Sequence, residues 1–468
     1  MSAFEQNLQA VLHRAIGEHC ELVSVARLTG GASQETYAVD TELKGEHVRY
    51  ALRRAAGGGA DVNDHGRTGL ATEARLIRLA AAHDVPEPEI LHVLEPLDQL
   101  GVGFLMTWLH GETLGSKIAR HDDFATIRPR LARQCGEILA RIHAIDVDQY
   151  ALRDHLDELT PKAFVEQQWD RYRALDTPQP MIDFTARWLL NNLPEAQETK
   201  LVHNDFRNGN LMVDPALGVT AVLDWEVAHL GDPMRDLGWM CTPSWRFGVD
   251  HLEVGGFGQL DDLIAGYESV SGTQVDRDAL HFWQVFGAFW WAIGCLLMAE
   301  HYRSGPDKTV ERPGIGRRSS ECQADCVNLL IPGPVPPLPG LEASGDDNMP
   351  TSAELLTSVR DFLRNEVSTE SKGRLKFLAR VASNSLDIII REQDHDAALK
   401  SAEHDRLKQM LESQQHLREL RWRLVNALRD DTIALDDPAL AIHLRETVMG
   451  QLAIDQPNYP ALKKARSN

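Results

Sequence analysis

The sequence contains little cysteine, with six residues in 468 and no C-x-x-C pair. This scarcity excludes a disulfide framework and a zinc ribbon, and it indicates reduced, mostly buried thiols. Cys322 and Cys326 are close in sequence, but no further Cys or His is spaced to complete a metal site with them. The first residues lack a basic flank before their apolar positions, so we expect no signal peptide and a cytoplasmic location.

Positive charge is also scarce, because 48 Lys and Arg residues face 69 Asp and Glu residues, which gives a net charge of −21. Nucleic acids and anionic membranes recruit basic surfaces. We therefore expect neither of them as a partner, and any anionic ligand must meet a local basic patch.

Long hydrophobic runs are rare, and the segment at 282–299 is the one that approaches the length of a membrane span. Gln284 lies inside it, and Glu300 and His301 follow at once. We expect a helix that is buried on all sides within a helical domain, since such a helix is also apolar all round.

What the sequence does contain is a dense group of polar residues between positions 201 and 226. His203, Asp205 and Asn210 follow the spacing H-x-D-x-x-x-x-N, and Asp224 ends the next apolar run. In a phosphoryl-transfer loop of this kind an Asp accepts the substrate proton, and oxygen ligands hold Mg²⁺. The spacing predicts Asp205 as a catalytic base and Asn210 and Asp224 as metal ligands.

Hairpin geometry offers a check on the two metal ligands. The turn D-P-A-L-G lies between two apolar runs, and a symmetric register pairs Asn210 with Val222. Asp224 is then the diagonal neighbour of Asn210 on the same face of the hairpin. A turn-flanking Asn and a strand-end Asp remain the alternative for either residue alone.

Three further polar residues belong to the same region. Arg207 is a second catalytic candidate, because its guanidinium would stabilise charge on the transferring phosphate, and a surface salt bridge is its alternative. His203 is expected to hold the loop by packing and hydrogen bonds. Asp236 is expected to cap the loop backbone from the following helix.

The first 110 residues alternate short strand-like runs with turns, at 22–28, 36–40, 48–53 and 103–109, around one helix at 70–83. Between the first two runs, a glycine turn places backbone N–H groups where they could approach phosphate. The candidates for this contact are Gly30, Gly31 and Ser33.

Glu73 lies on the predicted helix with no basic residue three or four positions away. A carboxylate held there needs a cation from elsewhere, or else it is exposed to solvent. Arg53 is the expected partner, and it could also reach the nucleotide phosphates, whereas Arg54 points to the opposite face of its strand.

The rest of the chain is rich in helix-forming periodicity, at 125–200 and 257–303, and then at 373–392, 402–429 and 437–453. A proline-rich segment at 330–350 separates the two parts. After it, Thr351 and Glu354 have the spacing of a capping box. We expect a bundle of about four helices there, acting as an interaction or stabilising module.

The pattern resembles the aminoglycoside phosphotransferase family over roughly residues 20 to 330. The resemblance rests on H-N-D-F-R-N-G-N, D-W-E at 224–226, L-A-R-I-H-A-I-D at 139–146 and V-P-E-P at 85–88. It implies an α+β, two-lobed protein-kinase-like fold, with an antiparallel-sheet N-lobe and a mainly helical C-lobe, followed by an all-α helical bundle domain. It also implies ATP and Mg²⁺ as cofactors, and an interlobe hinge at Met106, Thr107, Trp108 and Leu109, with the backbone of Thr107 and Leu109 bonding adenine.

Within that family, D-F-R-x-G-N, D-W-E, L-R-R and G-R-R at 316–318 look most like the kinase domains that accompany acyl-CoA dehydrogenases. Those domains are implicated in phosphorylating hydroxyacyl-CoA. Arg312, Arg317 and Arg318 are a candidate patch for the CoA polyanion, with structural salt bridges as the alternative. Two departures from the family are Arg53 in place of the usual Lys and Ser33-Gln34 where S-N is commoner.

The expected function is an ATP- and Mg²⁺-dependent small-molecule kinase that acts on a hydroxyl of a hydroxyacyl-CoA, of the 4-hydroxyacyl-CoA type. The alternatives are an aminoglycoside or sugar phosphotransferase, and a nucleotide-binding pseudokinase with a docking module. We expect self-association or partner contact, if any, through the C-terminal helical domain. The expected domains are an N-lobe at 1–107, a C-lobe at 108–335, a linker at 336–350 and a helical accessory domain at 351–468.

Overall fold

The computed structural model describes residues 1–28, 34–59, 68–195, 198–338 and 349–467. The chain forms two compact units. Unit 1 consists of Met1–Pro161 and Glu195–Trp283, and unit 2 consists of Lys162–Pro194 and Gln284–Asn468.

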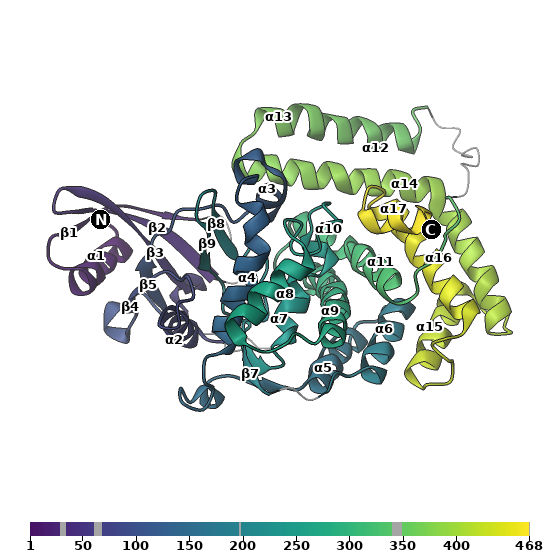
Figure 1. Ribbon diagram of the computed structural model, residues 1–468. Helices are drawn as coiled ribbons and strands as arrows, with labels where there is room; N and C mark the ends of the chain where they lie inside the picture. Colours follow the sequence, from purple (N-terminus) through teal and green to yellow (C-terminus); the bar gives the residue numbers. More distant parts are fainter. Residues whose placement is uncertain (29–33, 60–67, 196–197, 339–348, 468) are drawn as a thin grey trace. The chain divides into compact units, whose positions relative to one another are not determined.

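Unit 1 begins with a five-stranded antiparallel sheet in the order β1-β2-β3-β5-β4 (Figure 1). The pairings of β3 with β2 and with β5 are regular, and they place Arg53 of β3 opposite Thr36 of β2 and Phe104 of β5. The strands are β1 (Cys20–Arg27), β2 (Gln34–Leu43), β3 (Glu46–Ala55), β4 (Ile90–Val93) and β5 (Gly103–Thr107).

Two helices cover opposite faces of this sheet. Leu52 packs in one core cluster with the apolar stripe of α1 (Ala3–Ala15), and the next residue, Arg53, pairs with Glu73 of α2 (Leu70–Ala81). Since side chains of a strand alternate between faces, α1 and α2 lie on different sides. The prediction of a single helix in this region was wrong, because α1 is present and begins with a Ser2 capping box.

The remainder of unit 1 is mainly helical. Helices α4 and α8 cross closely where Gly136 faces the carbonyl of Leu263 and Gly266 faces that of Arg133, with no room for a Cβ at either glycine. The elements of this part are α3 (Gly115–Arg120), α4 (Arg128–His143), β6 (Glu158–Leu159), β7 (Lys200–Val202), β8 (Leu211–Asp214), β9 (Gly218–Val222), β10 (His229–Gly231), α7 (Met234–Met240) and α8 (Leu260–Ser271).

Unit 2 is helical, and one apolar core joins residues from distant parts of the sequence. Met181 and Phe184, which precede the 201–226 segment in sequence, pack with Leu424 and Leu452 near the C-terminus. Helix α9 (Arg277–Ser304) begins in unit 1 and continues into unit 2 from Gln284. The other helices of this part are α5 (Pro161–Arg173), α6 (Pro180–Asn191), α10 (Glu311–Arg317), α11 (Ser319–Leu330), α12 (Ser352–Asp361), a π-helical turn (Phe362–Val367), α13 (Ser368–Glu370), α14 (Gly373–Met410), α15 (Leu417–Arg429), α16 (Pro438–Asp455) and α17 (Pro460–Ser467).

The capping box at Thr351 and Glu354 is present at the start of α12, as predicted. The prediction of one helix at 402–429 was wrong, because α14 ends at Met410 and α15 begins at Leu417. Glu412 between them has a left-handed φ of 46°, which a continuing helix does not allow. The predicted proline-rich linker lies partly outside the described residues, and the domain ranges stay a prediction.

Helix α9 contains the apolar segment that resembles a membrane span. Among the described residues it is the one helix long and apolar enough to cross a membrane, and 61% of its most apolar window is buried. A core helix has this character as well. All six cysteines are free and buried, in agreement with the expected thiols.

Candidate active site

Asp236 of α7 holds the loop after β7 in place by accepting hydrogen bonds from its backbone. The Asp236 carboxylate accepts hydrogen bonds from the backbone N–H groups of His203, at 2.8 Å, and Asn204, at 2.7 Å. It also contacts the ring of His143 at 3.2 Å. Burial acts to raise the pKa of Asp236, but these hydrogen bonds outweigh it and hold the pKa below the ordinary value. The predicted capping role of Asp236 is confirmed.

The neighbour of Asp236 fixes the same loop from another side. Arg235 is fully buried, and its Nε donates to Oδ1 of Asn204 at 2.9 Å. Asn204 has a left-handed φ of 69°, and its amide donates to the carbonyl of Val227. Burial lowers the pKa of Arg235 to about 9. Two adjacent residues of α7 therefore fix the backbone that carries the candidate base.

His203 is packed inside this loop. Its ring lies 4.6 Å from the ring of Trp225 and 6.0 Å from that of Phe206, measured between centroids. Burial lowers the pKa of His203, and the N–H of Asp205 donates to its Nδ1. The expected role in loop packing agrees with this geometry.

Asp205 is the point on which the donors of the site converge. Its Oδ1 accepts from Nε of Arg207, at 3.0 Å, and from the indole of Trp239, at 2.8 Å. Its Oδ2 accepts from Nη2 of Arg207, at 3.3 Å, and from the amide of Asn210, at 2.6 Å. A carboxylate has about four lone-pair sites, so these donors fill them.

Arg207 is held between this carboxylate and an aromatic wall. Its guanidinium lies 4.3 Å from the ring centre of Trp245, which in turn meets Trp239 edge-on at 5.0 Å. Sequence reasoning missed both tryptophans, because neither falls at a fixed offset from the loop. The dipeptide G-W after Asp236 was the available signal, since α7 carries both the cap and the indole.

The symmetric hairpin register is present next to the turn, where Asp214 pairs with Gly218, but at the open end it was wrong by one residue. Leu211 pairs with Val222 and Met212 with Ala221, whereas Val213 pairs with Val219, so a bulge lies between the two pairings. The N–H of Leu223 then donates to the carbonyl of Asn210. Asn210 and Asp224 still flank the open end of the hairpin, but strand alternation no longer places them on one face.

Arg53 connects the N-terminal sheet to this hairpin. Its Nη2 lies 3.3 Å from Glu73 of α2 and 2.6 Å from Asp224, so the predicted Arg53–Glu73 ion pair is present. Glu73 is 1% exposed, whereas Asp224 is 33% exposed and has a left-handed φ of 71°. As predicted, Arg54 faces the other way, where it pairs with Glu35.

Burial raises the pKa of Glu73 to about 7, although the Arg53 guanidinium opposes this shift. The negative charges of Asp224 and Glu226 act in the same direction as burial. The site therefore contains a carboxyl that titrates near neutral pH beside a cation that keeps its charge.

We expect Glu73→Gln to change how stability depends on pH. Between the ordinary pKa of 4.5 and the folded value of about 7, the folded state binds more protons at Glu73 than the unfolded state does. Stability therefore falls as pH rises through this window. Urea midpoints across the window should show a wild-type slope that Glu73→Gln lacks. The exposed Glu89→Gln is the control, and an unchanged slope in Glu73→Gln would contradict the assignment.

The segment V-P-E-P lies against the same hairpin. The N–H of Val222 donates to the carbonyl of Pro86 at 2.8 Å, and the indole of Trp225 donates to Glu87 at 3.0 Å. Burial raises the pKa of Glu87 well above its ordinary value. V-P-E-P and D-W-E are far apart in sequence but contact each other in the fold.

Only some of the residues that we predict to contact nucleotide are among those that the structure describes. Met106 and Thr107 end β5, where the N–H of Thr107 donates to the carbonyl of Glu89 at 3.0 Å. Leu109 follows in a segment without helix or strand. Gly30, Gly31 and Ser33 lie outside the described residues, and Arg53 also bonds Gln34 beside them.

The side chains of Asn210 and Asp224 fit a magnesium ion by their chemistry. Both offer oxygen, which hard cations prefer, and Asp224 is partly exposed. Within the described parts of the chain, no group of three His, Cys, Asp or Glu residues could hold a metal alone. Magnesium in phosphoryl-transfer sites takes one or two protein ligands and completes its shell with phosphate and water. An incomplete protein shell is therefore compatible with this ion.

A small antiparallel sheet, a helix whose carboxylate pairs with a strand cation, and a helical part that carries an Asp-bearing loop define a kinase-like fold. The sequence model of the phosphotransferase enzyme family matches residues 24–273, and that of a domain of unknown function (DUF6285) matches 369–459. The chain therefore belongs to the phosphotransferase enzyme family. The expected family resemblance and fold class are confirmed.

Curated relatives agree with the resemblance to kinase domains that accompany acyl-CoA dehydrogenases. The chain is 32% identical to mouse (Mus musculus) acyl-CoA dehydrogenase family member 10, over 36% of this chain and 16% of that protein. It is 28% identical to chicken (Gallus gallus) acyl-CoA dehydrogenase family member 11, over 53% of this chain and 31% of that protein. The chain thus spans less than a third of either relative.

A solved structure shares the fold. It is a candidate aminoglycoside phosphotransferase from Ralstonia eutropha, with a TM-score of 0.55 and 23% identity. The likeness covers 69% of this chain and 96% of that one.

Proposed function

We propose that unit 1 is an ATP- and Mg²⁺-dependent small-molecule kinase that transfers the γ-phosphoryl group to a substrate hydroxyl. The observation that carries this proposal is the convergence of Arg207, Trp239 and Asn210 on Asp205. A carboxylate oriented by several donors at the end of a rigid loop is what a general base requires. Phosphoryl transfer otherwise needs positioning and cations rather than covalent help.

The contacts of Asp205 indicate how a hydroxyl would reach it. Its lone-pair sites are filled, so a substrate hydroxyl must displace one donor. Arg207 is the donor that can leave, because its side chain is 24% exposed, whereas Trp239 is buried in α7. A triphosphate offers Arg207 a competing anion, which would release Asp205 as substrate and nucleotide come together.

Arg53 occupies Asp224 as Arg207 occupies Asp205. The 2.6 Å contact of Arg53 occupies a carboxylate oxygen that a metal would use. Mg²⁺ on Asn210 and Asp224 would neutralise charge on the phosphate oxygens. Arg53 would then turn to the phosphates while Glu73 holds its position.

We place the adenine at Met106, Thr107 and Leu109 and the phosphates near Gly30, Gly31 and Ser33. Because the N–H of Thr107 is bonded to Glu89, its carbonyl is the group that can accept from adenine. Leu109 would supply the backbone N–H.

For the substrate we propose a hydroxyacyl-CoA of the 4-hydroxyacyl-CoA type. The support is the similarity to proteins named as acyl-CoA dehydrogenase family members. The arginine patch does not add to it, because Arg312 pairs with Asp307, Arg317 with Asp455 and Arg318 with Glu321. These are the structural salt bridges that we gave as the alternative.

The test is to incubate the full chain with γ-labelled ATP and Mg²⁺ and with separate panels of hydroxyacyl-CoAs, free hydroxyacids, sugars and aminoglycosides. We expect label in hydroxyacyl-CoA. Transfer to aminoglycosides alone would contradict the substrate, and ATP binding without any transfer would indicate a pseudokinase.

Trp239→Phe should lower kcat by about tenfold or more, because it keeps a ring against Trp245 but removes one hydrogen bond to a charged group. The apparent affinity for ATP should change little. Trp169→Phe is the matched control, since it removes an indole donor in unit 2. Equal activities of the two variants would contradict the role of Trp239.

A further inference from the structure

Thr68 is a buried threonine two residues before α2, and it contacts the segment that carries Asp224. Its backbone N–H donates to the carbonyl of Glu226 at 2.6 Å, and its Oγ1 donates to the carbonyl of Trp225 at 3.2 Å. Thr68 is 7% exposed, so water competes little for these bonds. One residue outside the hairpin therefore bonds both residues that follow Asp224.

The backbone of Asp224 needs support from its surroundings. Its φ of 71° is left-handed, a region that residues other than glycine rarely occupy and that neighbouring contacts must hold. The carboxylate contacts Arg53 at 2.6 Å. In the function proposed above, Arg53 turns to the phosphates, so this pair no longer holds Asp224 once nucleotide is bound. The contacts of the next two residues with Thr68 remain.

The side chain of Trp225 is held separately from its backbone. The indole is fully buried, lies 4.6 Å from the ring of His203 and donates to Glu87 at 3.0 Å. A shift of Asp224 must therefore come from rotation of the peptide groups that follow it, while the indole stays in place. The carbonyls of those peptide groups are the ones that Thr68 holds.

The hydroxyl of Thr68 can be removed without leaving a buried carbonyl unpaired. The carbonyl of Trp225 also accepts from the N–H of Ala228 at 3.1 Å. The bond from Thr68 to Glu226 uses a backbone N–H, which every substitution except proline keeps. Loss of the hydroxyl should therefore loosen the segment without unfolding unit 1.

We propose that Thr68 is a positioning residue for magnesium, because it fixes the carboxylate of Asp224 where it can bind the ion together with Asn210. This inference rests on the proposed function, in which Asp224 is a metal ligand. The hydroxyl of Thr68 is directed to the carbonyl of Trp225, so Thr68 acts on the ion only through Asp224. Its place at the start of α2 makes the position of Asp224 depend on that helix.

The test is calorimetric titration of the full chain with ADP, once with Mg²⁺ and once with EDTA. The ratio of the dissociation constant in EDTA to that in Mg²⁺ measures what the ion adds to nucleotide binding. Thr68→Val should lower this ratio by about fivefold, in the range of one net hydrogen bond, and should leave the affinity in EDTA unchanged. Thr68→Ser keeps the hydroxyl and should keep the wild-type ratio. Should Thr68→Val fail to fold, Thr68→Ala removes the same hydroxyl with less bulk and carries the same expectation.

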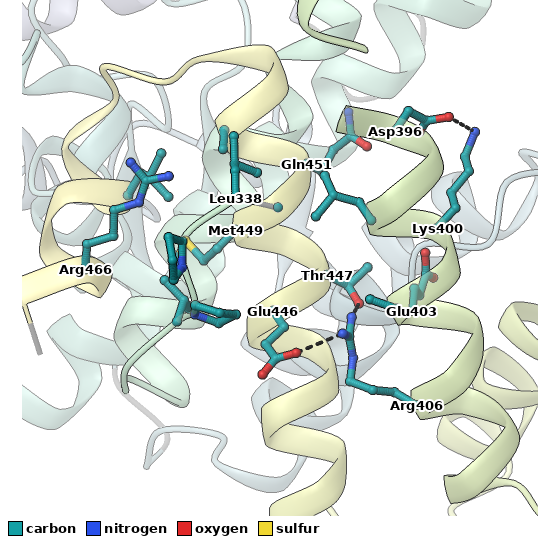
Figure 2. A pocket seen from close by; sticks show the side chains of 18 of the residues that line it. Leu338, Asp396, Lys400, Glu403, Arg406, Glu446, Thr447, Met449, Gln451 and Arg466 are labelled. Atoms are coloured by element: carbon teal, nitrogen blue, oxygen red, sulfur yellow. Dashed lines mark hydrogen bonds and ion pairs between the residues drawn. The ribbon is translucent and has the colours of Figure 1, made fainter. Parts of the chain in front are cut away.

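Two matched controls remove a threonine hydroxyl elsewhere in the chain. Thr41→Val, in β2 of unit 1, removes a buried hydroxyl that donates to the carbonyl of Val48 at 2.9 Å. Thr447→Val acts in unit 2, where Figure 2 shows Arg406 facing Glu446 and Thr447 in the lining of a pocket. Both variants should keep the wild-type ratio.

Hydrogen exchange of the metal-free protein gives a second readout, because Thr68→Val should speed exchange in a peptide that covers residues 224–228. An unchanged ratio in Thr68→Val would overturn the inference, and so would exchange at the wild-type rate. Binding that weakens equally in Mg²⁺ and in EDTA would indicate a merely structural role and would overturn it too. A ratio near one in the wild type would instead contradict magnesium binding itself, and with it the proposed function.

Discussion

Asp205→Asn should lower kcat by about a thousandfold, which lies in the range that a positioned general base contributes. The amide cannot take the hydroxyl proton, and it presents one oxygen where the carboxylate presents two. Nucleotide affinity should change little, because Arg53, Glu73 and Asp224 form a separate cluster. Initial rates with saturating substrate, together with ATP binding by calorimetry, measure both quantities.

Asp123→Asn is the matched control, because its side chain is 71% exposed and pairs only with a surface histidine in the contacts described. It should keep the wild-type rate. If Asp205→Asn turned over normally, or if it lost ATP binding in proportion to activity, Asp205 would not be the base.

Asp236→Ala should destabilise unit 1 by about 3 kcal/mol or more. The carboxylate is fully buried and accepts from the N–H groups of His203 and Asn204 and from His143. Without it, these donors stay buried and unpaired. Arg235 would also lose a neighbouring negative charge that offsets its own burial.

Urea unfolding measures this loss as a lower midpoint, and hydrogen exchange at His203 and Asn204 should become faster as the loop opens. Asp236→Asn keeps one acceptor oxygen, so its loss should be intermediate. A midpoint for Asp236→Ala equal to that of Asp123→Ala would contradict the anchoring role.

The parts of the site that sequence reasoning predicted are those set by local patterns. Period-two alternation separates Arg53 from Arg54, and the unpaired Glu73 on a helical face identifies Arg53 as its partner. The Asp236 cap follows from an acidic residue in the first turn of a short helix. Such inferences need only a few neighbouring positions.

The parts that failed depend on contacts across the fold. The hairpin bulge lies where Gln134 of α4 contacts the N–H of Val219 and crowds Gly218, and no local rule contains that helix. Trp239 reaches Asp205 because α7 lies under the loop, which spacing alone cannot show. Likewise, α6 joins the core of the C-terminal helices, although a long stretch of sequence separates them.

The most direct test of the central claim is mass spectrometry of a reaction that contains the full chain, ATP, Mg²⁺ and a 4-hydroxyacyl-CoA. The account predicts ADP and a phosphorylated acyl-CoA in equal amounts, with neither formed by Asp205→Asn. ADP formed without phosphorylated thioester, or phosphate transferred to an aminoglycoside but never to the thioester, would contradict it.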